Sequence, residues 1–380
     1  MRMLVLGAGL QGSACAYDLL QNKDVAEVRL ADLNTGHIAD FLGPYSGKRL
    51  IPTPLDVRNA EGVRALMRES DAVMSAIPYY FNLDLARHAA DVGVNFCDLG
   101  GNTDIVFEQK RLAAKAQENG ITIVPDCGLA PGMVNILAQH GIDQLDTVDE
   151  VKIFVGGLPQ NPEPPLNYQI VYSLEGVLDY YTTLSWVVRD GQRVQVKALS
   201  ELEPVRFDEP VGELEGFHTA GGLSTMAFRY EGKIPTMEYK TLRYPGHAKV
   251  MEAIRDLGLL DLDPIDVKGC RVSPRDVAIA VMAPRLTKAE GKDLVALRVT
   301  VKGKKGNEPK TIEYELVDRY DEKRGISAMM RTTGYSLSIT GQMQARGEVQ
   351  PPGVHTPDEC IPAQKYINEL QKRGINIRIS

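Results

Sequence analysis

The chain has 380 residues, of which 43% are hydrophobic and 24% are charged, and its formal net charge is −7. This length predicts two domains, and the balance of residue types is typical of soluble globular proteins. The negative charge, without a long basic run, gives no electrostatic support for binding nucleic acid or an anionic membrane. No stretch approaches the roughly 18 apolar residues of a membrane span, and the five scattered cysteines include no C-x-x-C pair. We therefore expect a cytoplasmic protein with neither a disulfide framework nor a metal site.

The N-terminal residues have a pattern typical of dinucleotide binding. Residues 3–6 predict a short buried strand, and G-x-G-x-x-G follows at residues 7–12, directly before a helical pattern. Glycines at this spacing permit a tight turn, close approach of the backbone to a pyrophosphate, and close packing of helix on strand. The helix N-terminus also attracts phosphate. The residues expected to bind the cofactor here are Gly7, Gly9, Leu10, Gln11 and Gly12.

An acidic residue ends the next predicted strand. Residues 28–31 are mostly apolar, and Asp32 follows Gly12 by 20 residues. In dinucleotide-binding domains a carboxylate at this position accepts hydrogen bonds from the adenosine ribose. Because it also repels a 2′-phosphate, and no arginine lies near Asn34 to reverse this, we predict NAD rather than NADP as the cofactor.

Strands and helices then alternate as far as residue 124. The expected strands are residues 50–52, 72–77, 95–98 and 121–124, and the expected helices are residues 38–42, 60–67, 83–92 and 105–119. This alternation predicts an α/β fold with a parallel, doubly wound Rossmann sheet, whose ligands bind beyond the carboxyl ends of the strands. Further candidates for cofactor binding at these ends are Asp56, Val57, Ile77, Pro78 and Leu129.

The pattern changes near residue 130. The expected strands become 150–155, 236–243, 294–301 and 311–317, with a hairpin across residues 187–196 and helices at 274–282, 327–346 and 357–370. Hairpins in place of alternating helices predict an α+β domain with a largely antiparallel sheet.

Two further motifs join the glycine pattern in a family resemblance. Asp98-Leu99-Gly100-Gly101 and the segment P-D-C-G-L-A-P-G-M at residues 125–133 resemble the saccharopine dehydrogenase family. The resemblance implies a Rossmann domain formed by residues 1–128 and completed by residues 346–380. It also implies an inserted substrate-binding and oligomerisation domain at residues 129–345, and a homo-oligomer, either a dimer or a larger assembly.

Other segments resemble the members of this family that oxidise L-lysine. They are residues 172–179, 217–222, 238–244 and 269–276. The implied reaction is NAD-dependent oxidative deamination at the ε-carbon, which yields ammonia, NADH and 2-aminoadipate 6-semialdehyde, an aldehyde that cyclises to piperideine-6-carboxylate. Saccharopine-forming relatives have aspartate where this chain has Ala130. A saccharopine- or carboxynorspermidine-type reductive amination and a non-catalytic NAD-binding role are the alternatives.

Lysine oxidation needs a cation for the α-carboxylate, an acid for the α-ammonium and a base near the reacting carbon. Arg243 is the candidate cation, since a guanidinium binds both carboxylate oxygens in one plane; a salt bridge at a strand end is its alternative role. The catalytic candidates are Asp98, Glu175 and His218. Asp98 could instead cap the following turn, and Glu175 could pair with an arginine. The further candidates for substrate contact are Tyr80, Thr219 and Asp126.

Overall fold

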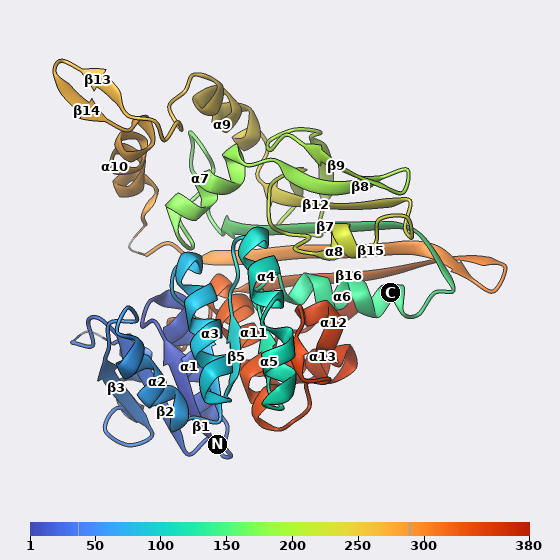
Figure 1. Cartoon of the computed structure of the whole chain (residues 1–380). Helices are drawn as coiled ribbons and strands as arrows, with labels where there is room; N and C mark the ends of the chain where they lie inside the picture. Colours follow the sequence, from blue (N-terminus) through green and yellow to red (C-terminus); the bar gives the residue numbers. More distant parts are fainter. Residues whose placement is uncertain (37, 289) are drawn as a thin grey trace. The chain divides into compact units, whose positions relative to one another are not determined.

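The computed structural model describes residues 1–36, 38–288 and 290–380 (Figure 1). These residues divide into two compact units. The first comprises Met1–Gln144, Asp321–Ile326 and Met330–Ile377, and the second comprises Leu145–Tyr320, Ser327–Met329 and Arg378–Ser380. The chain therefore leaves the first unit near residue 145 and returns to it near residue 321.

A seven-stranded parallel sheet forms the centre of the first unit. Its strands are β1 (Arg2–Leu6), β2 (Glu27–Asp32), β3 (Leu50–Pro54), β4 (Ala72–Ser75), β5 (Asn95–Asp98), β6 (Thr122–Val124) and β17 (Gly353–Val354). Their order is β17-β6-β5-β4-β1-β2-β3, and every pairing is parallel. The predicted Rossmann sheet is confirmed. The direction of winding reverses between β1 and β4, and such a switch point is where doubly wound sheets bind ligands.

The helices of this unit follow the predicted alternation, with changes in two predicted helices and one helix, at residues 133–142, that was not predicted. They are α1 (Leu10–Gln21), α2 (Ala60–Arg68), α3 (Asn82–Val92), α4 (Thr103–Lys110), α5 (Ala113–Glu118) and α6 (Met133–Ile142), with 3-10 turns η1 (Asp40–Tyr45) and η2 (Tyr79–Phe81). The predicted helix at 105–119 is divided into α4 and α5, and the break lets Leu112 and Ala116 pack on the core formed by β5 and β6. The predicted helix at 38–42 is instead η1, which contains Pro44, a residue without a backbone N–H to donate.

The C-terminal residues complete the first unit. They contain α11 (Ala328–Ala345), α12 (Pro357–Cys360) and α13 (Ala363–Lys372), while β17 extends the parallel sheet beside β6. The predicted helix at 357–370 is two helices, because the backbone before Pro362 is disfavoured from helical geometry. Compared with the predicted domain boundaries, the first unit also contains α6 and α11 from Met330 onward. Helix α11 belongs to this unit because it is hydrogen-bonded to the parallel sheet. Its Gln344 Nε2 donates to the carbonyl oxygens of Phe96 in β5 and Thr122 in β6, at 3.0 and 2.9 Å.

A nine-stranded sheet dominates the second unit. Its strands are β7 (Thr147–Pro159), β8 (Ser185–Arg189), β9 (Gln192–Val196), β10 (Glu203–Arg206), β11 (Glu213–His218), β12 (Thr236–Arg243), β15 (Asp293–Lys305), β16 (Glu308–Arg319) and β18 (Arg378–Ile379). Only the β12–β7 pairing is parallel among the described strands of this sheet, so the predicted largely antiparallel sheet is confirmed. In the β8–β9 hairpin Asp190 and Gly191 both have positive φ, as a tight two-residue turn requires.

Helices and a separate hairpin form the rest of the second unit. They are α7 (Leu174–Thr182), α8 (Met226–Arg229), α9 (His247–Asp256), α10 (Pro274–Leu286) and the hairpin of β13 (Ile265–Val267) with β14 (Cys270–Val272). Apolar residues of α7, α9 and α10 share one core cluster with Phe217 of β11. Ser273 caps α10 by accepting a hydrogen bond from the Asp276 N–H. Among the described helices, none combines the length and the apolar character that crossing a membrane demands.

A buried ion pair links α1 to the end of α13 within the first unit. Arg373 Nε donates to both carboxylate oxygens of Asp18, at 2.8 and 2.9 Å, and Ser338 Oγ donates to the same carboxylate at 2.7 Å. Burial raises the pKa of Asp18, although Arg373 opposes the shift. The pair therefore compensates a carboxylate that would otherwise be expensive to bury.

Arg373→Met should lower the free energy of unfolding by about 3–5 kcal/mol near pH 8, because Asp18 would remain buried without its cation. Losing the cation raises the pKa of Asp18 further, so the folded variant binds a proton more readily than its unfolded chain. The decrease in the free energy of unfolding should therefore become smaller as the pH falls toward about 5. Denaturant unfolding at the two pH values measures this effect. Asp18→Asn combined with Arg373→Met is the control and should recover part of the loss, whereas an unchanged midpoint in the single variant would contradict the assignment.

Candidate cofactor and substrate sites

The glycine turn of the first unit is shaped as the sequence predicts for a dinucleotide. Gly7 has φ +99°, and a Cβ there would lie 2.7 Å from the Ala76 carbonyl oxygen. A Cβ on Gly12 would lie 1.8 Å from the Gly7 carbonyl oxygen, so both positions require glycine. Gly9, by contrast, faces open space and is the N-cap of α1, with no side chain capping the helix. The first N–H groups of α1 are therefore available to a phosphate.

Two further side chains support this assignment. Gln11, in the first turn of α1, has both polar atoms of its amide buried without a hydrogen-bond partner. Asp32, at the end of β2, accepts from the Ala8 N–H at 2.7 Å through one oxygen and from the Asn34 N–H at 3.0 Å through the other. These residues fit a dinucleotide, because the turn provides phosphate donors and places a carboxylate at the neighbouring strand end.

The remaining candidates for cofactor binding lie along the same edge of the sheet. Asp56 follows β3 and pairs with Arg58, which lowers the pKa of the Asp56 carboxyl. Ile77 follows β4, and its Cγ2 would lie 2.8 Å from a Cβ on Gly7. The neighbouring positions of interest are Val57, Pro78 and the buried Leu129. Tyr80 is exposed in η2 and packs edge-on against Tyr79.

Asp98 is the most strongly perturbed carboxyl of this strand edge. Its side chain is fully buried at the end of β5 and has no cation as a partner among the described residues. It accepts from the Gly100 N–H and from Gln109 Nε2, both at 2.7 Å, and from the Asp126 N–H at 3.4 Å. Burial raises its pKa to about 6, which these hydrogen bonds oppose. Asp98 therefore holds the glycine pair in place and is also a competent proton acceptor above pH 6.

Asp126 occupies a constrained position beside this loop. It has φ +63°, an uncommon value for a residue other than glycine, and its side chain is buried. A Cβ on Gly100 would lie 1.7 Å from Asp126 Oδ1, so the carboxylate packs directly over that glycine.

Arg243 is a buried cation without a carboxylate partner among the described residues. It ends β12 and is 3% exposed. Its Nη1 donates to the carbonyl oxygens of Leu242 and Gly157, at 2.9 and 3.4 Å, while its Nε has no partner. The facing residue on β11 is Glu215, but that carboxylate accepts from the N–H groups of Gly246 and Ala248 at the start of α9. The guanidinium is therefore desolvated and lacks an anion.

Aromatic residues surround this guanidinium. Its carbon lies 4.8 Å from the centre of the Tyr168 ring, and the hydroxyls of Tyr181, Tyr168 and Tyr172 help to raise its pKa against the opposing effect of burial. The Tyr168 hydroxyl is buried without a hydrogen-bond partner. Tyr181 meets His247 Nε2 at 3.0 Å, and His247 Nδ1 lies 3.0 Å from the Leu166 carbonyl oxygen.

The environment of His247 fixes the direction of the Tyr181 hydrogen bond. Burial and Arg243 lower the pKa of His247 to about 3, so the ring is neutral. Because Nδ1 must donate to the Leu166 carbonyl, Nε2 accepts, and the Tyr181 hydroxyl is the donor. The lone pairs of Tyr181 are then left for a cation such as Arg243. Arg243 and Tyr168 retain donors that a bound carboxylate would satisfy.

His218 lies on the other face of the sheet from Arg243. In the β11–β12 pairing His218 is opposite Lys240, and Phe217 is opposite Thr241. Opposite residues share a face, and faces alternate along a strand. His218 and Lys240 therefore share one face, while Thr241 and Arg243 share the other. The structure does not bring the two candidates His218 and Arg243 together.

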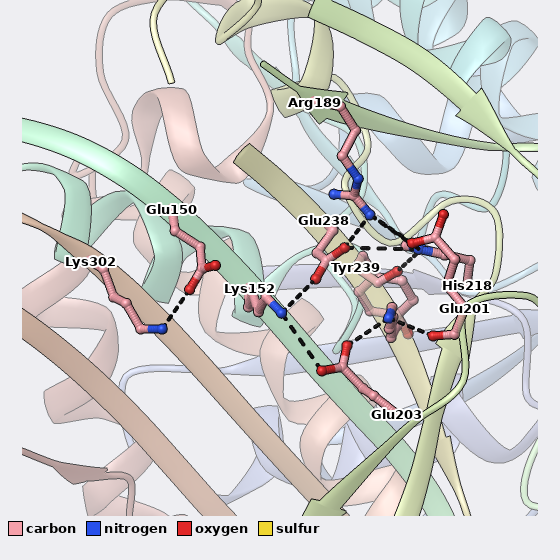
Figure 2. Close-up of polar contacts among 10 residues, drawn as sticks. Glu150, Lys152, Arg189, Glu201, Glu203, His218, Glu238, Tyr239 and Lys302 are labelled. Atoms are coloured by element: carbon pink, nitrogen blue, oxygen red, sulfur yellow. Dashed lines mark hydrogen bonds and ion pairs between the residues drawn. The ribbon is translucent and has the colours of Figure 1, made fainter. Parts of the chain in front are cut away.

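His218 belongs instead to an ion network (Figure 2). Its Nε2 lies 3.1 Å from Glu201 Oε2, and burial lowers its pKa although Glu201 opposes the shift. Glu201, His218 and Glu238 offer ligand atoms within 4.8 Å of one another, a spacing suitable for a metal ion. However, Arg189 Nη2 donates to Glu201 and Glu238 at 3.0 and 2.5 Å. A guanidinium already occupies the position between the carboxylates, and Lys152 adds a second cation 3.1 Å from Glu238.

The last two candidates differ in their surroundings. Thr219 is buried on the Arg243 face, where its Oγ1 lies 2.7 Å from Thr241 Oγ1. Glu175 is exposed in the first turn of α7, a position where a carboxylate favours the helix dipole. It has no ion pair among the described residues, so the pairing with an arginine that was its alternative role is not seen there.

Sequence reasoning missed the aromatic residues around Arg243. Tyr168, Tyr181 and His247 come from a loop, from α7 and from the start of α9, and only the fold brings them to one strand end. One signal was available, because four of the chain's 15 tyrosines lie within residues 168–181. Such clustering indicates a shared environment, but it does not reveal that an arginine lies at its centre.

Comparison with known proteins gives a consistent result. A model described as the saccharopine dehydrogenase NADP binding domain matches residues 3–124, and one described as the saccharopine dehydrogenase C-terminal domain matches residues 128–375. The mitochondrial alpha-aminoadipic semialdehyde synthase of Mus musculus is 26% identical over 272 residues, which cover 68% of this chain but 28% of the mouse protein. The carboxynorspermidine synthase of Vibrio alginolyticus is 24% identical over 417 residues, which cover 99% of this chain and 96% of that protein.

A solved structure supports the fold. Apo saccharopine dehydrogenase (L-Glu forming) from Saccharomyces cerevisiae superimposes with a TM-score of 0.81 at 21% identity, covering 100% of this chain and 99% of that one. The parallel sheet and the glycine turn of the first unit are those of a Rossmann-type dinucleotide-binding domain. The C-terminal domain model alone matches more than half of this chain. The chain therefore belongs to the saccharopine dehydrogenase family.

Proposed function

We propose that the protein is an NAD-dependent lysine 6-dehydrogenase, which removes the ε-amino group of L-lysine. The observation that carries the proposal is Arg243, a buried guanidinium with an unpaired Nε and no acidic partner in the described chain. Burying a cation without an anion is costly, so such a group is expected where a ligand supplies the anion. An amino-acid α-carboxylate has the planar pair of oxygens that a guanidinium binds best.

The number of cations favours a substrate with one carboxylate. On the Arg243 face the aromatic neighbours are neutral, and His247 stays uncharged because its pKa is about 3. Lysine has one carboxylate, whereas saccharopine has three and would require further cations. Ala130 also replaces the aspartate found in saccharopine-forming relatives. A reductive amination of the carboxynorspermidine type is the second candidate, and the near-complete alignment with the Vibrio alginolyticus protein is the observation that favours it.

The reaction requires a neutral ε-amine. The free lysine ammonium has a pKa near 10.4, so the protein must desolvate it or provide a base. Asp98, with its pKa raised to about 6, is ionised at alkaline pH and can accept a proton there. A bound nicotinamide ring supplies the hydride acceptor. Water then adds to the imine, and ammonia leaves.

NAD is the proposed cofactor because the Asp32 carboxylate, which follows the glycine turn at the end of β2, would accept from the ribose hydroxyls and repel a 2′-phosphate. Arg58, the cation beyond the next strand end, is held by Asp56 at 2.6 Å. Turnover with NADP should therefore be much lower than with NAD. Asp32→Ala should narrow that preference while leaving the lysine KM at saturating cofactor nearly unchanged. Equal kcat/KM for NAD and NADP in the unmodified protein would refute the cofactor assignment.

Arg243→Met tests whether Arg243 binds the substrate or only stabilises the fold. We expect the lysine KM to rise by a factor of about 30 to 1000, since losing a charge-assisted bidentate contact costs roughly 2–4 kcal/mol. The free protein should not lose stability, because an unpaired buried charge is removed. His218→Asn, on the opposite face, is the matched control and should leave the lysine KM within about twofold, since it cannot reach the same ligand. Steady-state kinetics and thermal melts measure both effects; a variant that melts early with normal KM would contradict the role.

Isotopic labelling tests the reaction itself. With L-lysine deuterated at the ε-carbon, the label should appear in the reduced cofactor and ammonia should be released. Mass spectrometry of the cofactor and an ammonia assay provide the readout. Transfer of an α-deuterium instead would show an α-amino acid dehydrogenase. Turnover only in the reductive direction, with an amine and a carbonyl compound together, would favour the second candidate.

A further inference from the structure

The exposed apolar residues of the described chain are concentrated in one region of the second unit. Sixteen large hydrophobic residues are strongly exposed, and eight of them lie within residues 250–281. They are Val250, Leu257, Leu259, Leu262, Ile265, Val267, Val277 and Val281. Single exposed hydrophobic residues are ordinary, but such a concentration marks an interaction surface.

The β13–β14 hairpin supplies part of this surface. Ile265 lies opposite Val272, Val267 lies opposite Cys270, and Asp266 lies opposite Arg271. Opposite residues share a face, so one face is apolar and the other carries an acid on β13 and a base on β14. The hairpin forms a sheet of two strands and extends beyond α10 (Figure 1). A two-stranded sheet is marginal in water by itself, and here its apolar face is exposed.

The outer side of α10 continues the apolar surface. Val277 and Val281 are four residues apart, so they lie on the same side of the helix, and both are about half exposed. A groove of about 470 Å³ lies between the hairpin and this helix. Its lining is mainly apolar, with charged residues of both signs, and comprises Pro264, Val272, Val277, Ala280, Ser273, Arg271 and Asp276.

The base of this region is firmly held. Arg275, in the first turn of α10, is buried and pairs with Asp179 of α7. It also donates to the Leu260 carbonyl oxygen at 2.9 Å and to Thr182 Oγ1 at 3.0 Å. The hairpin and groove, which together we call the arm (residues 257–281), are therefore a fixed projection.

We propose that the arm binds the arm of a second copy of this chain through a two-fold interface. A two-fold interface must be self-complementary, because the same surface serves on both sides. The arm meets this requirement, since Ile265 and Val267 are exposed apolar projections while Val272 and Val277 line a groove to receive them. This inference is independent of the proposed reaction.

The charges of the arm agree with pairing between identical copies. The tip carries Asp266 and Lys268, and the groove carries Arg271 and Asp276. Each surface therefore has one acid and one base, so two copies related by a two-fold axis can oppose unlike charges at both ends. A partner whose surface carried charges of one sign would place a like charge opposite one residue of the arm at each end.

Light scattering and chemical cross-linking test the arm on the intact protein. The unmodified chain at micromolar concentration should have a mass of at least two chains of 41.8 kDa. Ile265→Asp combined with Val281→Asp should reduce that mass at least twofold, with an unchanged circular dichroism spectrum. Leu202→Asp, at a residue 49% exposed outside the arm, is the matched control and should keep the wild-type mass.

Cysteine chemistry locates the contact. Cys270 is exposed in β14, whereas Cys15, Cys97, Cys127 and Cys360 are buried. A bis-maleimide should therefore yield cross-linked dimers that disappear in Cys270→Ser. A monomeric unmodified chain would overturn the proposal and point to a different occupant. An oligomer that persists in the double variant, or that resists Cys270 cross-linking, would place the interface elsewhere and overturn it equally.

Discussion

A buried cation is stable only when an anion or several electron-rich groups contact it. Arg243 has no anion, and its electron-rich contacts are incomplete. Two backbone carbonyls and the ring of Tyr168 compensate the guanidinium incompletely, while its Nε stays unpaired. The chain could have relieved this cost with Glu215, which lies opposite on β11. That carboxylate instead accepts from the first N–H groups of α9, the helix that begins with His247. An unpaired buried charge lowers the stability of the fold. Natural proteins keep such destabilising features mainly at binding sites.

The nine-stranded sheet separates two kinds of chemistry by its alternation. On one face, Lys302 pairs with Glu150, and Lys152 pairs with Glu238, so cations and carboxylates balance across neighbouring strands (Figure 2). On the other face, Arg243 has aromatic neighbours, and the carboxylate opposite it, Glu215, already accepts hydrogen bonds from N–H groups of α9. A charge-balanced network has nothing left for a ligand, which explains why a cluster with suitable metal-ligand spacing around His218 is better described as an ion network. The face that remains unbalanced is the one suited to an anionic group.

The sequence predicted the first unit better than the second for a physical reason. The glycine turn, Asp32 and the strand ends depend on local spacing, and a parallel sheet brings its carboxyl ends to one edge whatever the details of packing. The environment of Arg243 depends on the pairing register of β11 with β12 and on where α7 and α9 lie, which no local pattern specifies. His218 shows the limit clearly. Its neighbours in the sequence suggested a substrate contact, but a shift of one residue along a strand reverses the face on which a side chain lies.

Three buried ionisable groups illustrate how the chain treats charge. Asp18 has Arg373 as a full ion partner, and Arg243 retains an unpaired donor. Asp98 has only N–H donors, and its pKa is raised to about 6. A carboxyl whose pKa is higher in the folded than in the unfolded chain contributes stability that is fully present below the unfolded pKa and is lost as the pH rises through 6. The proposed reaction, however, needs a neutral amine and an ionised Asp98, both of which higher pH favours. The pH that suits the chemistry is therefore the pH at which burying Asp98 costs the fold most, so its hydrogen bonds to Gly100 and Gln109 must hold a carboxylate, not a carboxylic acid, in the working protein.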